Sequence, residues 1–465
     1  MPALSVAVSE SRPAWERLNQ LMEALQEGAP KALVASVEHE VARAFAAAQA
    51  EFVGTLLQRS DVNAPRVMID GVLHRRVGRS AKSLMTLAGP VVVERALYTP
   101  MKREPGTNSV SALELRVGVV SGFFTPASAS AVAWAGAHLV PREVEELFRR
   151  TGQMAPSRSS IDRLMKSLST RWEDNREQFE TAMTATISIP EGTASVAASL
   201  DGTMIPMSSG AQRERRAQQK AEDKKQTGPV GYKEASVATL SFLDVKGQVL
   251  STIRHARMPE TRKRALKAAL LRDMTQVHAL APQLPIVKVA DGVDDNWTFL
   301  KNAPGDIEVI DFFHACEHFY DALATAWGTT RARAEFPIWR DVLRDCTDGV
   351  VVIVSLLRKL RRAFPRRTKV RRALGYFVRN RRRMQYATTR ARGLPIASGV
   401  VEAACKTVVA SRMRRAGMRW SMAGGQALLT LRAAALSGNF DGVFELAAPP
   451  RHEVEAAHLT IVRSE

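Results

Sequence analysis

The sequence has 465 residues, a hydrophobic content of 45% and a formal net charge of +19. This amount of apolar material is enough for two or three packed domains, and the positive charge predicts a polyanionic partner, which is usually nucleic acid and alternatively a membrane surface. We expect a cytoplasmic protein without a membrane-spanning or secretory segment, because no apolar run is as long as a bilayer span, and the three scattered cysteines exclude a disulfide framework or a cysteine zinc site.

The first 135 residues are expected to form a helical or mixed region. Residues 14–59 carry apolar side chains at helical spacing, which is typical of a helical bundle and of elements that self-associate. From Gly89 to Tyr98 the pattern alternates, which predicts a strand, and residues 100–111 are expected to be a loop.

Residues 136–190 have the order of a helix-turn-helix followed by a linker helix. A short helix that starts at Pro141 is broken at Gly152, and a second helix begins after Ser157, a favourable helix cap. The second helix carries the basic side chains that a recognition helix places against DNA, namely Arg158, Arg163 and Lys166. Many helical hairpins with this order do not bind DNA, so a purely structural interpretation stands beside this one.

Residues 191–319 change to the periodicity of a sheet. Three antiparallel strands, a helix, a strand, a helix and a strand are expected, with a basic loop between the first two strands at residues 211–226. This order predicts a mixed sheet with helices on its faces, in which the first and fourth strands lie side by side and parallel.

Two of these strands end at an acid followed by glycine, Asp201 and Asp291. Each alone fits a turn cap, because Asp-Gly is common in turns. Side by side, however, the two carboxylates cannot both stay ionised without a cation. With Glu402 as a third converging acid they form the oxygen-rich site that Mg²⁺ prefers. We therefore expect two Mg²⁺ ions, for which Mn²⁺ can substitute, acting on a phosphodiester.

Glu402 lies in a very basic part of the chain. Between Gly349 and Phe440 there are 21 lysines and arginines, and Glu402 is the only acid. It falls in the first turn of a predicted helix, where a carboxylate also suits the helix dipole. Residues 396–445 are expected to carry this helix and a phosphate-binding surface after it, formed by Lys406, Arg412, Arg414, Arg415 and Arg419. Trp420 could stack on an unpaired base. Core packing is nevertheless the expected role of Trp420 and of Trp297, and we expect Trp297 to pack beneath the site of the acids.

Four motifs in this chain resemble bacterial insertion-sequence transposases of the ISKra type, which are relatives of the Mutator-like DDE transposases. They occur in the family's order between about Val140 and Ser437. The motifs are Ser-Leu-Asp201-Gly-Thr, Val-Ala-Asp291-Gly-Val-Asp-Asp-Asn-Trp, Asp311-Phe-Phe-His314-Ala-Cys-Glu-His318, and Ser-Gly-Val-Val-Glu402-Ala-Ala-Cys-Lys-Thr with Arg-Met-Arg-Arg-Ala-Gly-Met-Arg-Trp.

The resemblance implies an α/β protein with an RNase H-like, mixed-sheet catalytic core, preceded by a mainly helical N-terminal DNA-binding region. The core would comprise residues 191–319 and 396–445, with Asp201, Asp291 and Glu402 as catalytic and metal-binding triad. Asp311 and His314 would form the family's Asp-x-x-His element in a supporting role. Residues 320–395 would be an all-helical insertion, and residues 446–465 are expected to be a tail.

The insertion carries a run of basic residues without the acids that usually intersperse a solvated face. We expect it to line a DNA channel. The basic residues assigned to this channel are Arg361, Arg362, Arg366, Arg367, Arg371, Arg372, Arg381, Arg382 and Arg383, in a run that extends from Arg358 and Lys359.

One departure from the family concerns the strand near Tyr98. Many relatives have a cysteine pair just after it, whereas this chain has Met101, Lys102 and Arg103, so we expect no zinc knuckle there. A competing motif is His314-Ala-Cys-Glu-His318, which matches the signature of a zinc protease but leaves Asp201 and Asp291 unexplained.

Together these patterns predict a DNA transposase that binds the duplex ends of its element, hydrolyses phosphodiesters with metal-activated water and joins the ends to target DNA. A homodimer or higher oligomer on DNA is expected, with nucleoid association and no membrane partner. The alternatives are a catalytically silent domesticated transposase that serves as a DNA-binding regulator, and an RNase H-like nuclease that only hydrolyses.

Overall fold

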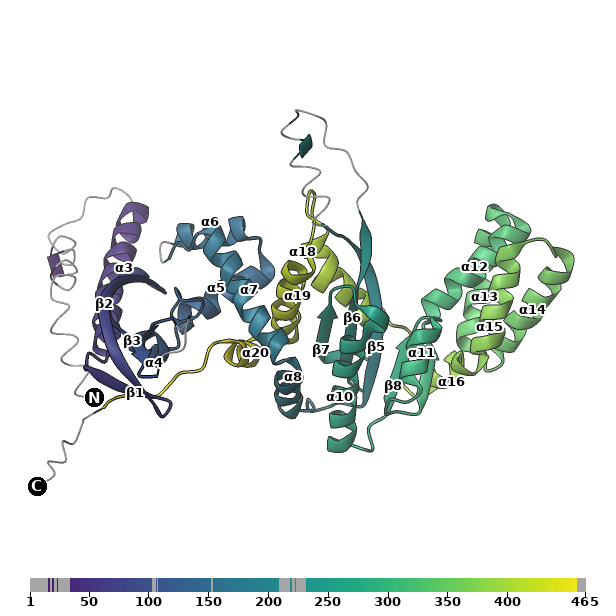
Figure 1. The fold of residues 1–465 in the computed structure, drawn as a ribbon. Coiled ribbons are helices and arrows are strands. Elements are labelled where there is room, and N and C mark those ends of the chain that lie inside the picture. Colours follow the sequence, from purple (N-terminus) through teal and green to yellow (C-terminus); the bar gives the residue numbers. More distant parts are fainter. Residues whose placement is uncertain are drawn as a thin grey trace, which may run out of the picture. The chain divides into compact units, whose positions relative to one another are not determined.

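The computed structural model describes residues 34–102, 108–151, 154–208 and 231–457, together with a few isolated residues. The chain divides into two compact units, one formed by residues 1–174 and 441–465 and the other by residues 175–440. Each unit contains one five-stranded sheet (Figure 1). Gly152, Arg103 and most of the basic loop expected at residues 211–226 lie outside the described residues.

A mixed sheet in the order β7-β6-β5-β8-β9 forms the centre of the second unit. Strands β5, β6 and β7 are antiparallel, whereas β8 is parallel to β5 and β9 is parallel to β8. Their bounds are β5 (Ser195–Pro206), β6 (Tyr232–Leu243), β7 (Val249–Arg257), β8 (Ile286–Ala290) and β9 (Ile307–Ile310). The predicted order of strands is confirmed, and so is the parallel pairing of the first and fourth.

Different helices cover the two faces of this sheet. On β6, Leu240 and Phe242 pack in one cluster with helix α10 (Arg264–Leu280), while Val237 packs in another with the segment around Glu402. That segment comprises α17 (Gly399–Ala404), a π-helical turn (Cys405–Ala410), α18 (Ser411–Met413) and α19 (Met422–Ser437). Asp201 pairs with Val237. Because paired residues point to the same face of a sheet, Asp201 faces the side that carries Glu402.

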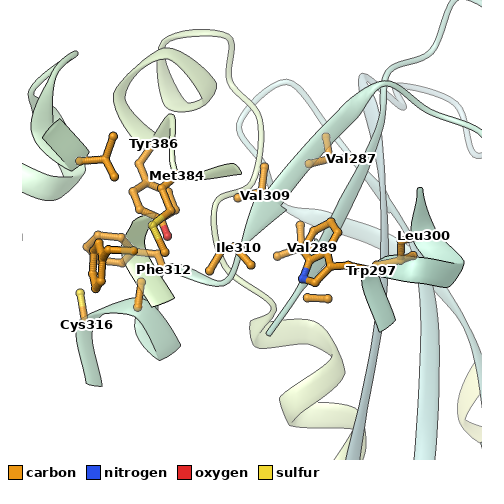
Figure 2. Packing of buried hydrophobic residues seen from close by; sticks show 14 of the residues in the cluster. Val287, Val289, Trp297, Leu300, Val309, Ile310, Phe312, Cys316, Met384 and Tyr386 are labelled. Atoms are coloured by element: carbon orange, nitrogen blue, oxygen red, sulfur yellow. The ribbon is translucent and has the colours of Figure 1, made fainter. Parts of the chain in front are cut away.

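The core continues from the sheet into the helical insertion. Val289 and Val309 belong to the same buried cluster as Phe312, Met384 and Tyr386 (Figure 2), and the rings of Phe312 and Tyr386 meet edge to face. Residues 320–395 form helices and the turns between them. The elements are α12 (Phe312–Trp327), α13 (Thr329–Asp345), α14 (Gly349–Ala363), α15 (Thr368–Asn380), a 3-10 turn η2 (Arg381–Arg383) and α16 (Tyr386–Ala391). The unit also has α8 (Arg176–Ala185), η1 (Thr261–Lys263) and α11 (Asp294–Leu300).

The first unit contains a sheet that the sequence analysis missed. Its antiparallel strands run in the order β10-β1-β2-β3-β4, with bounds β1 (Arg66–Ile69), β2 (Val72–Thr86), β3 (Gly89–Pro100), β4 (Val110–Ser111) and β10 (Val454–Ala456). The predicted strand at Gly89 is confirmed, but the expectation of a mainly helical region is wrong for residues 66–111, and the expected tail includes a strand. Successive residues from Arg75 to Arg79 are exposed on β2, so this strand lacks the alternation by which strands are recognised.

Helices complete the first unit. Helix α3 (Val34–Arg59) packs against β3, and α5 (Pro126–His138), α6 (Pro141–Thr151) and α7 (Arg158–Asp174) pack on one another. Helices α6 and α7 are the two predicted helices of the helix-turn-helix. The other helices of this unit in the described ranges are α4 (Ala112–Val117) and α20 (Phe440–Ala447). None of the helices in the described ranges has both the length and the apolar composition needed to cross a membrane.

Candidate active site

Three acids follow one another across neighbouring strands of the mixed sheet. The parallel register of β5 and β8 continues, two residues beyond the last pair, to Asp201 and Asp291, which therefore lie opposite each other. Asp311 directly follows β9, and its N–H donates to the carbonyl of Ala290 on β8 at 2.9 Å. Parallel strands thus bring Asp201, Asp291 and Asp311 to one level of the sheet, at the carboxyl ends of β8 and β9. The expectation that the first strand ends at Asp201 is wrong, because β5 continues to Pro206 in its pairing with β6.

Asp201 is a half-buried carboxyl group beside a second acid. Its Oδ1 accepts the Gly202 N–H at 2.7 Å, and the Cys405 thiol lies 3.8 Å from its Oδ2. Burial raises the pKa of Asp201, and the neighbouring Asp291 raises it further, against the lowering effects of the Gly202 N–H, Lys263 and His314. A bound cation would reverse this shift, so Asp201 is suited to be a metal ligand.

The turn after Asp291 holds its carboxylate in place. Asp291 Oδ1 accepts the Val293 N–H at 3.2 Å and the side-chain amide of Asn296 at 3.0 Å. The Trp297 indole N–H donates to the Asp291 carbonyl at 2.5 Å, so Trp297 packs beneath the acid, as predicted. Asn296 is almost completely buried. Sequence reasoning did not single it out, although its place five residues after Asp291 in the motif was an available signal.

Asp311 has no exposed surface and uses both of its carboxylate oxygens. Oδ1 accepts the backbone N–H of His314 at 2.7 Å and so caps α12, while Oδ2 accepts the N–H and hydroxyl of Ser398 at 2.5 and 2.7 Å. Burial alone would raise its pKa, but the hydrogen bonds from His314 and Ser398 hold the pKa of Asp311 at about 2. Asp311 is therefore an anion that joins the starts of α12 and α17.

This contact with Ser398 positions Glu402. Ser398 immediately precedes α17, and the Glu402 N–H donates to the Ser398 carbonyl one turn earlier, at 3.2 Å. One carboxylate oxygen of Glu402, one of Asp311 and one ring nitrogen of His314 lie within 4.8 Å of one another. Within the described ranges, no other group of three acidic, histidine or cysteine side chains is close enough to share a metal ion.

His314 is a common neighbour of these acids. Its hydrogen bond with Asp311, with 3.4 Å between Nδ1 and Oδ1, raises the pKa of His314 to about 9, and the charges of Asp311, Glu317 and Asp291 act in the same direction. The imidazole is therefore protonated at neutral pH. It supplies a positive charge to the site. The supporting role of His314 stays a prediction.

The three predicted acids, Asp201, Asp291 and Glu402, lie around one site but are not all in contact. Asp201 and Asp291 are adjacent, and Glu402 reaches His314, whose charge acts on Asp201. Among the described residues, however, the carboxylate oxygens of Asp201, Asp291 and Glu402 do not all lie within 4.8 Å of one another. The atoms that could bind a metal are carboxylate oxygens, and the charges of Asp201 and Asp291 repel each other. The three residues therefore fit a hard divalent cation such as Mg²⁺.

Comparisons with known proteins yield a distant structural likeness. No protein-family model and no curated protein matches this sequence. A solved structure of the Drosophila P element transposase strand transfer complex is similar to this chain, with 12% sequence identity, a TM-score of 0.35, and coverage of 71% of this chain and 96% of that chain. So low a similarity carries no argument about function, which has to be inferred from the residues of this chain.

The two histidines of the His-x-x-Glu-His sequence have different neighbours. His314 contacts Asp311, whereas His318 stacks on Tyr376 of α15 with ring centroids 4.2 Å apart, and burial lowers the pKa of His318. In the described part of the chain, His318 belongs to no group of three potential metal ligands. The structure thus gives the zinc-protease alternative no support.

Tyr376 also brings the insertion into contact with the site. A Cβ atom on Gly292, the residue after Asp291, would overlap the ring of Tyr376, so only glycine fits there without a shift. The charges of Asp291, Asp311 and Glu317 add to the effect of burial, which raises the pKa of the Tyr376 hydroxyl. The insertion therefore forms part of the wall beside Asp291.

The basic residues after Glu402 are of two kinds. Arg412 is buried, with its guanidinium 5.8 Å from the ring centroid of Trp420, and the Trp420 indole N–H donates to the Met413 carbonyl at 2.9 Å. These contacts favour packing roles for Arg412 and Trp420. DNA binding stays a prediction for the exposed Lys406, Arg414 and Arg415 and the half-buried Arg419.

Exposed basic side chains gather on α14, α15 and the turns at their ends. In the described part of the chain, the following form no salt bridge with an acid: Arg358, Lys359, Arg362, Arg366, Arg367, Arg371, Arg372, Arg381 and Arg382. Arg361 is half-buried. Arg383 pairs with Glu308 at 2.6 Å and lies over the Trp297 ring, 4.2 Å from its centroid, which favours a structural role for Arg383. The DNA channel stays a prediction.

The predicted recognition helix α7 exposes its basic side chains. Arg158 pairs with Glu145 at 2.7 Å, Lys166 pairs with Asp162 at 2.6 Å, and Arg163 is exposed. Exposed ion pairs of this kind contribute little to stability and can give way to a phosphate. Contact with DNA stays a prediction for these three residues.

Proposed function

We propose that this protein is a DNA transposase of the ISKra type with an RNase H-like core. The observation that carries the proposal is the placement of Asp201 and Asp291 opposite each other on parallel strands, with Glu402 on a helix that Asp311 docks beside them. The exposed basic side chains of α14 and α15 support a polyanionic substrate.

In this proposal, Asp201, Asp291 and Glu402 hold the divalent ions. When bound, such ions polarise the scissile phosphate and lower the pKa of the attacking water or hydroxyl group. Asp311 and the His314 imidazolium keep Glu402 in place. The same site would first cut the ends of the element and then bring the freed 3′-hydroxyl to a phosphodiester of target DNA. Synapsis of two ends implies a dimer or larger assembly on DNA.

The test is an assay of the purified full chain with Mg²⁺ and a duplex that carries the terminal sequence of the element encoding it. We expect metal-dependent cleavage at the end of the element and joining of the 3′-hydroxyl to a second duplex. Cleavage without joining would assign a nuclease instead, and specific binding without cleavage would assign a DNA-binding regulator.

His314 offers a prediction that separates support from metal ligation. His314→Ala should retain measurable cleavage with Mg²⁺ but be slowed by about tenfold to a hundredfold, as for other residues that orient metal ligands. His314→Asn keeps one donor and should recover part of the loss. If cleavage instead requires zinc, and His314→Ala no longer binds that zinc, the site is that of a zinc protease and the transposase assignment is wrong.

Thermal unfolding as a function of pH checks the same contact without a substrate. The pKa of His314 is raised from 6.5 to about 9 in the folded protein, so its ion pair stabilises the fold below pH 6.5 and loses this effect as the pH rises through 9. The melting temperature of the wild type should therefore exceed that of His314→Asn at pH 6, and the difference should vanish by pH 10. A difference independent of pH would mean that the imidazole is not charged.

A further inference from the structure

The second unit contains a cavity on the face of its sheet that lies opposite to the acids. Lys288 of β8 pairs with Ala198 of β5, and Ala198 pairs with Leu240, which packs with α10. Paired residues point to the same face, so Lys288 faces α10, whereas Asp201 faces the segment around Glu402. The cavity has a volume of about 1030 Å³ and is lined by α10, β8, β9 and the loop after α11.

A glycine allows the loop after α11 to form one wall of this cavity. Gly305 has φ 95°, in the left-handed region, and a Cβ atom on it would lie 2.5 Å from the carbonyl oxygen of Ile286. Only glycine fits this close approach without strain. The wall combines apolar and polar side chains, from Leu271, Leu284, Pro304, Gln283 and Asn302. This volume and mixed lining suit an organic molecule better than a single ion.

Lys288 brings a buried charge to the cavity. It stands in the middle of an otherwise apolar strand and is only 2% exposed. Lysine is rarely buried to this extent unless an acid pairs with it. The Lys288 Nζ donates to the Ala303 carbonyl at 3.3 Å and lies 3.7 Å from Glu308 Oε1, which is too far for a hydrogen bond. Because an ammonium group has three donors, the contacts in the described part of the chain leave two of them without an acceptor.

The acid nearest to Lys288 belongs to another ion pair. Glu308 accepts a hydrogen bond from Arg383 Nε at 2.6 Å, so Arg383 already compensates most of its charge. Burial lowers the pKa of Lys288, against the raising effects of Glu308 and Asp306. A positive charge in this position is unfavourable for the fold, and a bound anion would offset the loss of hydration.

The rim of the cavity adds further positive charge. Lys301 and Arg392 line it and are exposed, as is His278 in the last turn of α10. Of the lining residues, all of which the structure describes, only Asp306 is an acid that Arg383 does not engage. With Lys288, the three cationic side chains exceed this one acid by two charges. The excess favours a ligand with two negative charges.

We propose that this cavity binds a small phosphorylated molecule of about the size of a mononucleotide, with its phosphate group on Lys288. A phosphate monoester carries about two negative charges at neutral pH, as the cavity requires, whereas a carboxylate carries one. Lysine serves as a point charge for phosphate, and Lys301 and Arg392 would contact the same group from the rim. The organic part would lie against Leu284 and Pro304. The cavity is on the other face from the acids, so this inference does not depend on the proposed function.

Isothermal titration calorimetry of the full chain at physiological salt tests the proposal, with inorganic phosphate, ribose 5-phosphate and adenosine 5′-monophosphate as probes. We expect one site per chain and a dissociation constant below about 1 mM for at least one probe. Tighter binding of the nucleotide than of phosphate would identify an organic phosphate as the ligand, and equal binding would identify free phosphate. Both results support the site. Failure of all three probes to bind would overturn it.

Lys288→Met removes the charge at similar volume and should weaken binding of the best probe at least about tenfold, as for loss of a charge-assisted hydrogen bond. Glu308 keeps Arg383 as its partner, so the melting temperature of the free variant should not fall below that of the wild type. A lower melting temperature with unchanged affinity would mean that Lys288 serves the fold, and would overturn the proposal.

Two exposed positions keep the test valid if Lys288→Met does not fold. Lys301→Gln and Arg392→Gln should each weaken the best probe by about threefold or more. Lys246→Gln is the matched control, because Lys246 is an exposed lysine in the turn after β6 and does not line the cavity. Its affinity should equal that of the wild type. An equal loss in Lys246→Gln and Arg392→Gln would show that the probe binds to the basic surface in general, and would overturn the proposal.

DNA is the competing occupant of the cavity. A random duplex should displace none of the bound probe, and Lys288→Met should bind this duplex like the wild type. If the duplex displaces the probe, and Lys288→Met weakens both ligands equally, the cavity belongs to the surface that binds DNA and the proposal of a small ligand is wrong.

Discussion

Replacement of Asp201, Asp291 or Glu402 by alanine should reduce DNA cleavage by at least about a thousandfold, because each change removes a carboxylate that, in the proposed function, would hold the divalent ions at the phosphodiester. Binding to element ends should stay within about threefold of the wild type, since contacts with phosphates position the DNA and are separate from the chemistry. Single-turnover cleavage and a gel-shift titration on the same duplex measure the two effects.

Glu191→Ala is the matched control for these variants. Glu191 is an exposed acid in the turn before β5, and its loss should leave both cleavage and binding unchanged. A triad variant that still cleaves at more than about a tenth of the wild-type rate would remove its residue from the metal site. Asp311→Ala should behave differently, because it removes the acceptor of the two hydrogen bonds from Ser398. This variant should therefore have a lower melting temperature as well as a lower cleavage rate.

Neutralising four exposed arginines of the insertion, Arg362, Arg366, Arg367 and Arg371, should weaken DNA binding at least about a hundredfold at low salt, whatever the sequence of the duplex. Each phosphate contact contributes about 0.9 to the slope of log affinity against log salt concentration, so the slope should flatten by about 3 to 4. Fluorescence anisotropy with a random duplex at several salt concentrations measures both quantities.

A second quadruple variant changes the net charge equally without touching this surface. Arg331, Arg340, Arg344 and Arg390 pair with acids of the same insertion, and their replacement by glutamine should alter the slope by less than about 1. Equal slopes for both quadruple variants would mean that the net charge of the protein, and not a channel on α14 and α15, attracts DNA.

The core of the second unit could be predicted because local patterns determine it. Apolar runs that lead to Asp201 and Asp291, with a helix between the third and fourth strands, leave few alternatives to a mixed sheet in which these two strands are parallel neighbours. The helical nature of the insertion followed from the family resemblance. The sheet of the first unit escaped prediction because its longest strand is exposed on both faces near Arg75 and because its edge strand comes from Val454, far along the chain.

The finer geometry of the site depends on contacts between residues that are distant in sequence. No spacing indicated that Asp311 would bind Ser398 or that the helix after Glu402 would contain a π-helical turn. A π-helical turn changes the direction of later side chains, so whether Arg412 faces solvent or the core cannot be read from helical periodicity. For this reason the burial of Arg412, which the sequence assigned to DNA, was not predicted.

Strand β10 is the last strand of the first unit to be synthesised. It forms the edge next to β1, yet about 385 residues separate Ile69 from Val454. At a translation rate of about 5–20 residues per second, the ribosome needs roughly 20–80 s to make the intervening chain. For that time the outer edge of β1 lacks its own partner, and an unpaired edge accepts any suitable strand. The sheet of the first unit is therefore completed only after the whole second unit has been synthesised.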